Sequence, residues 1–207
     1  MSNQISIAAV TCALRYLLTP SLKIVPGAQV TTVRPDALGK NKLTRGVNLY
    51  LYRVTPNTSY RNIDIPTRRS DGSVASKPTQ VVDLCFLVTC FGDETKLESQ
   101  LLMGASVARF HENPVLPKSV IQEAIDAHGD IVSGADLAEQ NPRPRVLMEA
   151  MSDEELSKIW SVLYQVPYML TTAYRVGPVF LETDLDVDPR EPVSDVNVGF
   201  DEMDNAP

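Results

Sequence analysis

Residues 46–66, GVNLYLYRVTPNTSYRNIDIP, constrain the fold more than any other stretch of this sequence. The run at 47–54 is rich in β-branched and aromatic residues, which is typical of a β-strand. Apolar side chains occupy both alternating sets of positions, so the pattern predicts a central strand covered on both faces. We expect the strand to stop at Thr55-Pro56-Asn57, because proline cannot donate to a ladder and asparagine tolerates turn geometry.

The polar and aromatic residues that follow this strand predict a loop that contacts a partner. Residues 61–79 contain few apolar side chains, and we expect them to form a mobile loop. A simpler interpretation of Arg61 and Asn62 is that they satisfy the carbonyl groups of the turn. The candidate contact residues are Asn57, Tyr60, Arg61, Asn62, Arg68 and Arg69.

The rest of the chain mixes helical and strand-like segments, without an internal repeat. Helix-period apolar residues and capping signals predict helices at 5–18, 93–111, 117–128 and 153–164. β-rich runs predict strands at 81–91, 146–151 and 168–181, with weak strand character at 131–132. The order lacks strict βαβ alternation, so we predict an α+β (mixed α/β) fold, a single domain with one mixed β-sheet flanked by helices.

Local signals place the ends of two helices. Ser2 or Asn3 should cap the first helix, which should end before Pro20. Ser152 and Glu155 form a capping box, in which each residue satisfies a free N–H of the other at the start of the last helix.

Two helical faces and one irregularity are also predicted. Gly177-Pro178 should mark a bulge or an edge near the end of the last strand. Apolar spacing predicts which side chains of the helices at 93–111 and 153–164 face inward. They are Leu97, Leu101, Leu102, Ala105, Val107 and Ala108 on the first helix, and Leu156, Ile159, Trp160 and Leu163 on the second.

The acidic residues concentrate at the end of the chain. The whole sequence has a formal net charge of −7, yet residues 182–207 carry nine acidic residues and only one base, Arg190. We therefore predict a domain at 1–181 and an acidic tail at 182–207, neither of which suits nucleic acid. The start of the tail differs from a calcium loop, because Pro189 stands where glycine is required. Its acids are further candidates for partner contact: Asp184, Asp186 and Asp188.

We predict no catalytic, cofactor-binding or metal site. The sequence lacks glycine-rich phosphate loops and the nucleophile-elbow motif, and its two histidines have no second ligand at metal spacing. Cys12, Cys85 and Cys90 lie inside apolar runs, so we expect reduced core thiols in a reducing compartment. A cysteine-dependent enzyme that uses Cys85 or Cys90 with His111 is an alternative.

No targeting segment is expected at the N-terminus. The apolar run at 5–18 lacks a basic region and a cleavage site and is interrupted by Arg15. At this length the run is too short to span a bilayer. We therefore expect a protein that is cytoplasmic when made.

Four blocks of the sequence, in the same order, resemble the Pvc16-type family. They are VNLYLYRVTPN followed by RN, the run VVDLCFLVTCFGD, the helix and turn LLMGASVARFHENPVL, and the block MSDEELSKIWSVLYQVPYMLTTAYRVGPVFLET. The amphipathic start ISIAAVTCALRYLL is similar as well. The residues that carry the motif, to which we assign structural roles, are Asn48, Tyr50, Tyr52, Pro56, Trp160, Tyr168 and Tyr174.

The resemblance implies a structural function, because this family comprises cap, or tail-terminator, proteins of contractile injection systems. It implies a fold like that of phage tail terminators and a homo-oligomeric ring, a hexamer, that ends the sheath and inner tube and holds them together. The implied partners are other copies of the chain, the sheath protein, and the inner tube protein or a tube-terminating protein. The implied location is a phage tail-like particle, released or membrane-anchored. An assembly factor absent from the finished particle is the alternative.

Overall fold

A computed structural model of the chain describes residues 4–37, 44–61, 79–162 and 167–182. Their strands form one mixed sheet in the order β1-β2-β3-β5-β4. All neighbouring pairs are antiparallel except β1 and β2, which are parallel. The strands are β1 (Gln29–Thr31), β2 (Gly46–Pro56), β3 (Thr79–Phe91), β4 (Arg145–Glu149) and β5 (Leu170–Glu182). The predicted α+β class, one mixed sheet flanked by helices, is confirmed.

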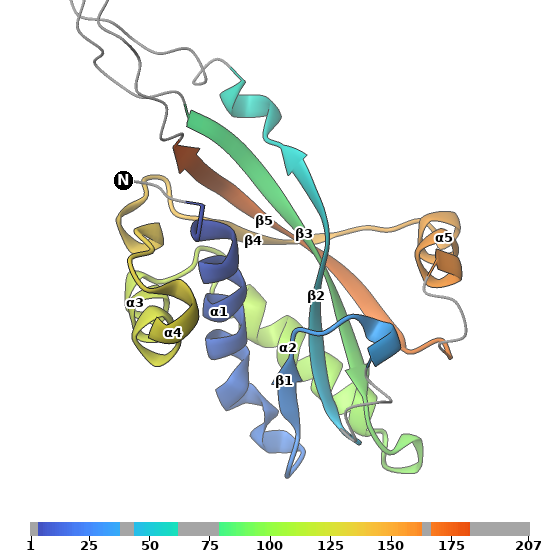
Figure 1. Cartoon of the computed structure of the whole chain (residues 1–207). Coiled ribbons are helices and arrows are strands. Elements are labelled where there is room, and N and C mark those ends of the chain that lie inside the picture. The colour runs from blue at the N-terminus through green and yellow to red at the C-terminus, as the bar shows by residue number, and fades with distance from the viewer. Residues whose placement is uncertain (1–3, 38–43, 62–78, 163–166, 183–207) are drawn as a thin grey trace, which may run out of the picture.

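The helices lie on both sides of this sheet, but unequally. Helices α1 to α4 form a layer on one side, whereas α5 stands alone on the other (Figure 1). The helices are α1 (Ser6–Leu18), α2 (Glu98–Glu112), α3 (Lys118–Ala127), α4 (Gly129–Val132) and α5 (Asp153–Val162). Short 3₁₀ helices lie in the connections between these helices and the strands. They are η1 (Thr19–Ile24), η3 (Thr58–Tyr60), η4 (Glu94–Lys96) and η5 (Leu137–Glu139).

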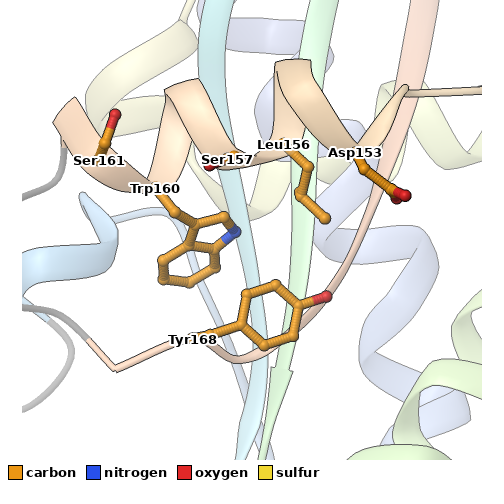
Figure 2. A pocket seen from close by; sticks show the side chains of 6 residues that line it. All are labelled: Asp153, Leu156, Ser157, Trp160, Ser161 and Tyr168. Atoms are coloured by element: carbon orange, nitrogen blue, oxygen red, sulfur yellow. The ribbon is translucent and has the colours of Figure 1, made fainter.

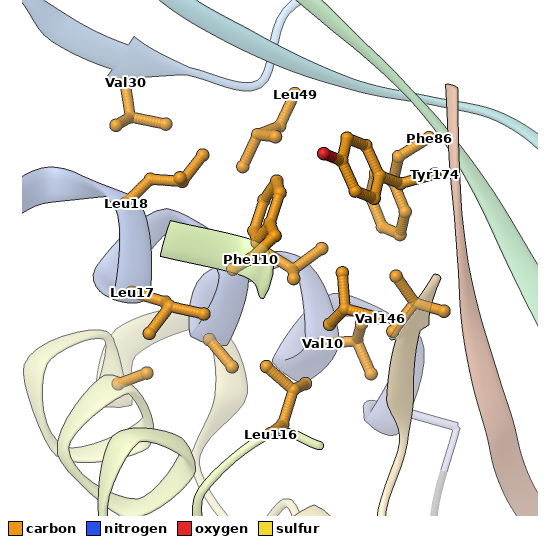
Figure 3. Packing of buried hydrophobic residues seen from close by; sticks show 14 of the residues in the cluster. Val10, Leu17, Leu18, Val30, Leu49, Phe86, Phe110, Leu116, Val146 and Tyr174 are labelled. Atoms are coloured by element: carbon orange, nitrogen blue, oxygen red, sulfur yellow. The ribbon is translucent and has the colours of Figure 1, made fainter. Parts of the chain in front are cut away.

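The hydrophobic core fills the space between the sheet and the α1–α4 layer, a side that we call the core face (Figure 3). Alternate residues of β3, the middle strand, point into it, and Phe86 is fully buried there. Phe110 of α2 meets Tyr174 of β5, with ring centroids 4.7 Å apart. Leu17 of α1 belongs to the same buried cluster on the side of the helix layer. This packing places β3 at the centre of the domain and makes the core face the main source of stability.

The strand predicted to be central, β2, is covered only in its first half. Gly46–Leu49 is buried, whereas Val54 is 45% exposed. The reason is that the short strand β1 pairs with Gly46–Asn48 only, so β2 lies between two strands for three residues. The two strands approach closely at Gly46, which has a φ of 156°. Only glycine fits there, because a Cβ would collide with the Gln29 carbonyl oxygen. The predicted burial of the second half is therefore wrong.

The buried face of α2 shares only Leu102 with the predicted face. Its start is delayed, because Asp93 caps η4 and Leu97 takes a left-handed conformation before Glu98. The buried residues are Glu98, Leu102, Ser106 and Phe110, whereas Leu97 and Leu101 are 53% and 44% exposed. The Glu98 carboxylate accepts the Asp93 N–H at 2.9 Å and pairs with Arg45 at 3.2 Å. These partners allow the Glu98 carboxylate to be buried on a face that the apolar pattern did not predict to be buried.

Three smaller predictions need correction. Ile5 takes the N-cap position of α1 without a side-chain bond, while Ser2 and Asn3 lie outside the described residues. Residues 131–132 belong to α4 and not to a strand. Helical structure continues past Leu18 through η1, so Ser6–Ile24 is long and apolar enough to cross a membrane. In this fold its apolar side packs into the core.

Candidate interaction surface

The turn after β2 is held by one asparagine. The Asn57 backbone N–H donates to the Val81 carbonyl at 2.9 Å. Its side-chain oxygen accepts the Ser59 N–H at 3.0 Å, and its amide nitrogen donates to Asp83 Oδ1 at 2.8 Å. Pro56 ends the strand as predicted. Since both polar atoms of its side chain are bonded within the chain, Asn57 has a structural role in this turn.

Asp83, which binds Asn57, also faces the bulge in β5. The register between β3 and β5 shifts between Val82 and Leu84, opposite Gly177-Pro178, as the sequence predicted. A Cβ at Gly177 would collide with the Asp83 carboxylate. The sequence pattern predicts no role for Asp83, although a lone acid in an apolar strand is a visible signal.

The other turn residues divide between packing and exposure. Tyr60 packs edge-on against Phe180 of β5, with ring centroids 5.5 Å apart. Arg61 is exposed, and no ion pair involves it within the described part of the chain. The candidates Asn62, Arg68, Arg69, Asp184, Asp186 and Asp188 lie outside the described residues. The structure therefore brings Asn57 and Tyr60 together at the end of the sheet, with Arg61 beside them.

The side of β2 that faces away from β3 forms an unpaired strand edge. Beyond Asn48, β3 is the only strand that pairs with β2 among the described residues. We call the unpaired side of residues 49–56 the outer edge of β2. Unpaired N–H and C=O groups along such an edge can bind another strand. The outer edge contains one arginine, Arg53, and no acid, and Arg61 lies just beyond its end.

On the side of the sheet away from the core face, which we call the α5 face, packing is looser. Helix α5 has no buried residue. Its capping box forms as predicted, with the Glu155 N–H donating to Ser152 Oγ at 3.2 Å and the Ser152 N–H donating to Glu155 Oε2 at 3.1 Å. These bonds, led by the Ser152 N–H, lower the pKa of Glu155.

Trp160 and Tyr168 line a pocket of about 430 Å³ beside α5 (Figure 2). Their ring centroids are 5.5 Å apart, and Tyr168 is 62% exposed. The predicted inward side chains Leu156, Ile159 and Trp160 are all only half-buried, and Leu163 lies outside the described residues. The apolar face of α5 therefore lies toward the sheet but is only half-buried, whereas full burial was predicted.

The motif residues on β2 and β5 mostly serve packing. Asn48 is buried, donates to the Val33 carbonyl at 2.9 Å and accepts from Thr31 Oγ1 at 2.8 Å. Tyr50 and Tyr52 are half-buried, and burial raises the pKa of Tyr52. Tyr174 belongs to the core.

The cysteines are poorly suited to catalysis. Cys85 and Cys90 are each 1% exposed. Burial raises the pKa of Cys90 to about 12, so its thiol is protonated at neutral pH and is a weak nucleophile. Cys85 lies on the α5 face next to Arg53, and this contact raises the pKa of the arginine. In the described ranges, no three His, Cys, Asp or Glu side chains are grouped so that they could hold a metal ion.

Comparison with known proteins gives a family and a fold. The sequence model of the family described as the Pvc16 N-terminal domain matches residues 9–195. The chain is similar to the sheath/tube terminator of PVC, an extracellular contractile injection system, in its extended state, with a TM-score of 0.64 and 15% identity. It is also similar to the tube-terminating cap of the anti-feeding prophage, with a TM-score of 0.57 and 14% identity. No curated protein sequence matches.

These structural matches cover more of this chain than of the relatives. The first covers 100% of this chain and 66% of the terminator, and the second covers 93% of this chain and 59% of the cap. At such low identity they show a shared fold. Together with the family model, which spans nearly the whole sequence, they show that this chain belongs to the Pvc16 N-terminal domain family.

Proposed function

We propose that this protein is a structural terminator of a contractile injection particle. The observation that carries the proposal is the match of the family model over residues 9–195, together with a fold that aligns along the whole chain with a sheath/tube terminator. The protein caps the tube and sheath at the end distal to the baseplate. It is made in the cytoplasm and then becomes part of the particle.

The working form is a homo-oligomeric ring, a hexamer. A ring of this kind needs two different patches on each subunit, because each copy binds the next in a head-to-tail manner. The domain at 1–181 supplies the rigid body, and residues 56–79 with the tail at 182–207 supply the contacts to neighbouring copies, sheath and tube. The contact residues in these segments are Arg61, Asn62, Arg68, Arg69, Asp184, Asp186 and Asp188.

The protein has no enzymatic role in this proposal. Burial of Cys85 and Cys90, and the raised pKa of Cys90, argue against thiol chemistry. Replacing both cysteines with alanine should therefore leave capping intact in any variant that still folds. Loss of particles despite a folded double variant would favour the enzyme instead.

Cryo-electron microscopy of particles from cells with and without the gene tests the terminator role. We expect a ring of density at the end distal to the baseplate, and its absence together with loss of length control in the deletion strain. Particles of normal length without such density would contradict the proposal and favour an assembly factor that leaves the finished particle.

Deleting residues 185–207 tests the contribution of the tail. We expect fewer capped particles and a broader distribution of lengths, with the folded domain preserved. Unchanged particle length and yield would show that the tail has no part in capping.

A further inference from the structure

We propose that residues 195–201 of the tail add as a β-strand to the outer edge of β2 in a neighbouring copy. This inference deepens the proposed ring and rests on it. It assigns two complementary patches of this chain to one contact.

The receiving surface is the second half of β2. Its inner side is fully used by the antiparallel ladder to β3, which continues to Pro56 opposite Val82. Its outer side pairs with β1 only up to Asn48 among the described residues. Among the described residues, no strand pairs with this side of residues 49–56. Strand addition is the usual way in which such an edge binds a peptide.

The two faces of this edge differ in chemistry. Leu51 and Val54 pair with Phe86 and Leu84 and so lie on the core face, where Val54 is 45% exposed. Arg53 pairs with Cys85 on the opposite, α5 face and is exposed. An added strand that fits here needs apolar side chains on one face and polar or acidic side chains on the other.

The tail sequence 195–201, DVNVGFD, has this alternation. Val196, Val198 and Phe200 share one face of an extended strand, while Asp195 and Asp201 share the other. The three apolar residues would extend the row formed by Leu51 and Val54. The acids would then lie on the face that presents Arg53.

Charge and linker length allow the tail to bind this edge, and the proposed ring places the edge in a neighbouring copy. The tail carries nine acids and one base, whereas the receiving edge carries Arg53 and no acid, with Arg61 just beyond it, so the two segments attract one another. β5 ends at Glu182, and the intervening residues 183–194 span roughly 40 Å when extended, at about 3.3 Å per residue. That length is sufficient to leave the domain and reach a neighbour.

Disulfide trapping between two differently tagged full-length chains tests the contact. One chain carries Val54→Cys, and the other carries cysteine at 196, 198 or 200. Both carry Cys12→Ala, while Cys85 and Cys90 stay because each is 1% exposed. We expect an oxidised dimer that contains one chain of each tag, since directly opposed residues of paired strands lie within disulfide distance.

The matched control uses the alternation of a strand. Cysteine at 197 or 199 should not cross-link with Val54→Cys, but should cross-link with Arg53→Cys, which lies on the other face. The chain with Arg53→Cys also carries Cys85→Ala, because Arg53 pairs with Cys85 across the ladder to β3. Equal cross-linking at all tail positions would indicate random collision and would overturn the proposal. When both cysteines lie in one chain, a cross-link only within that chain would show that the tail covers its own β2.

Self-association of the purified chain gives a second readout. Removing residues 195–207 should weaken it by about tenfold or more, and the triple variant at Val196, Val198 and Phe200 to serine should do the same. High salt should also weaken the self-association of the intact chain, because the opposite charges are exposed to solvent.

Failure of this contact differs from failure of the proposed function. If particles are capped but the cross-link forms neither in the purified chain nor in the particle, the strand addition is wrong and the terminator role stands. The specific cross-link in particles that lack a terminal ring would support the contact and contradict the terminator role.

Discussion

The two faces of the sheet are built from the same strands but packed to different degrees. On the core face, four helices cover a continuous cluster that includes Phe86 and Phe110. On the α5 face stands one helix of 10 residues, which has no buried side chain. The comparison teaches that one face determines whether the domain folds, whereas the other can change its packing at a lower cost in free energy.

Truncation in the core should have the largest effect. Phe86→Ala removes a fully buried aromatic ring, and we expect it to lower the free energy of unfolding by about 3–5 kcal/mol. Leu156→Ala, on half-buried α5, should cost about 1 kcal/mol or less by the same reasoning. Chemical denaturation followed by circular dichroism measures both. Equal losses would break the contrast between the faces.

The two buried cysteines report on the two faces separately. Cys90 belongs to the core cluster, whereas Cys85 lies on the α5 face beneath Tyr52 and Arg53. We expect pulsed alkylation to modify Cys85 at a lower denaturant concentration than Cys90, because the α5 face opens locally before the domain unfolds. Site-resolved mass spectrometry measures this order. Simultaneous modification of both thiols would show that the faces unfold as one unit.

Loss of the α5 cap should have a smaller, local effect. Ser152→Ala removes the hydroxyl that accepts the Glu155 N–H, which costs about 1 kcal/mol for a typical N-cap. Trp160 is the sole tryptophan of the chain, so its fluorescence reports on α5 alone. We expect the fluorescence transition to move to lower denaturant while the circular dichroism transition stays in place. A Ser152→Thr control should retain most of the cap.

Acid should loosen the same helix by a still smaller amount. The Ser152 N–H and hydroxyl hold the pKa of Glu155 below its ordinary value of 4.5. Because this pKa is depressed in the folded state, the stabilisation is present above about pH 4.5 and is lost as the pH falls through the lower, folded pKa. Tryptophan fluorescence against pH should show this transition in the native chain. A Glu155→Gln variant that keeps the same transition would assign it to another group.

Local signals in the sequence predicted local structure well. The Ser152–Glu155 cap and the bulge at Gly177 each depend on neighbouring residues or on one residue type, so both could be read directly. The same holds for β3, whose apolar run is buried along its length as predicted. Such features need no knowledge of distant partners.

The wrong predictions for α2 and β2 depend on contacts between distant residues. The buried face of α2 follows from Glu98, whose carboxylate is satisfied by Arg45 more than fifty residues earlier. The exposure of Val54 follows from the shortness of β1, which pairs with only three residues of β2. In the candidate site, Asn57 and Tyr60 were identified, but their partners Asp83 and Phe180 lie on other strands. A pattern within one segment carries no information on these partners.

The position of β5 has a mechanical consequence. This strand is hydrogen-bonded to β3 on one side and to β4 on the other, and the tail continues from its end at Glu182. A pull on the tail along the strand axis therefore acts on these bonds in shear, so that many must break together and not one after another. Such a pull would pass from β5 to β3, the middle strand, and load the sheet without unzipping it.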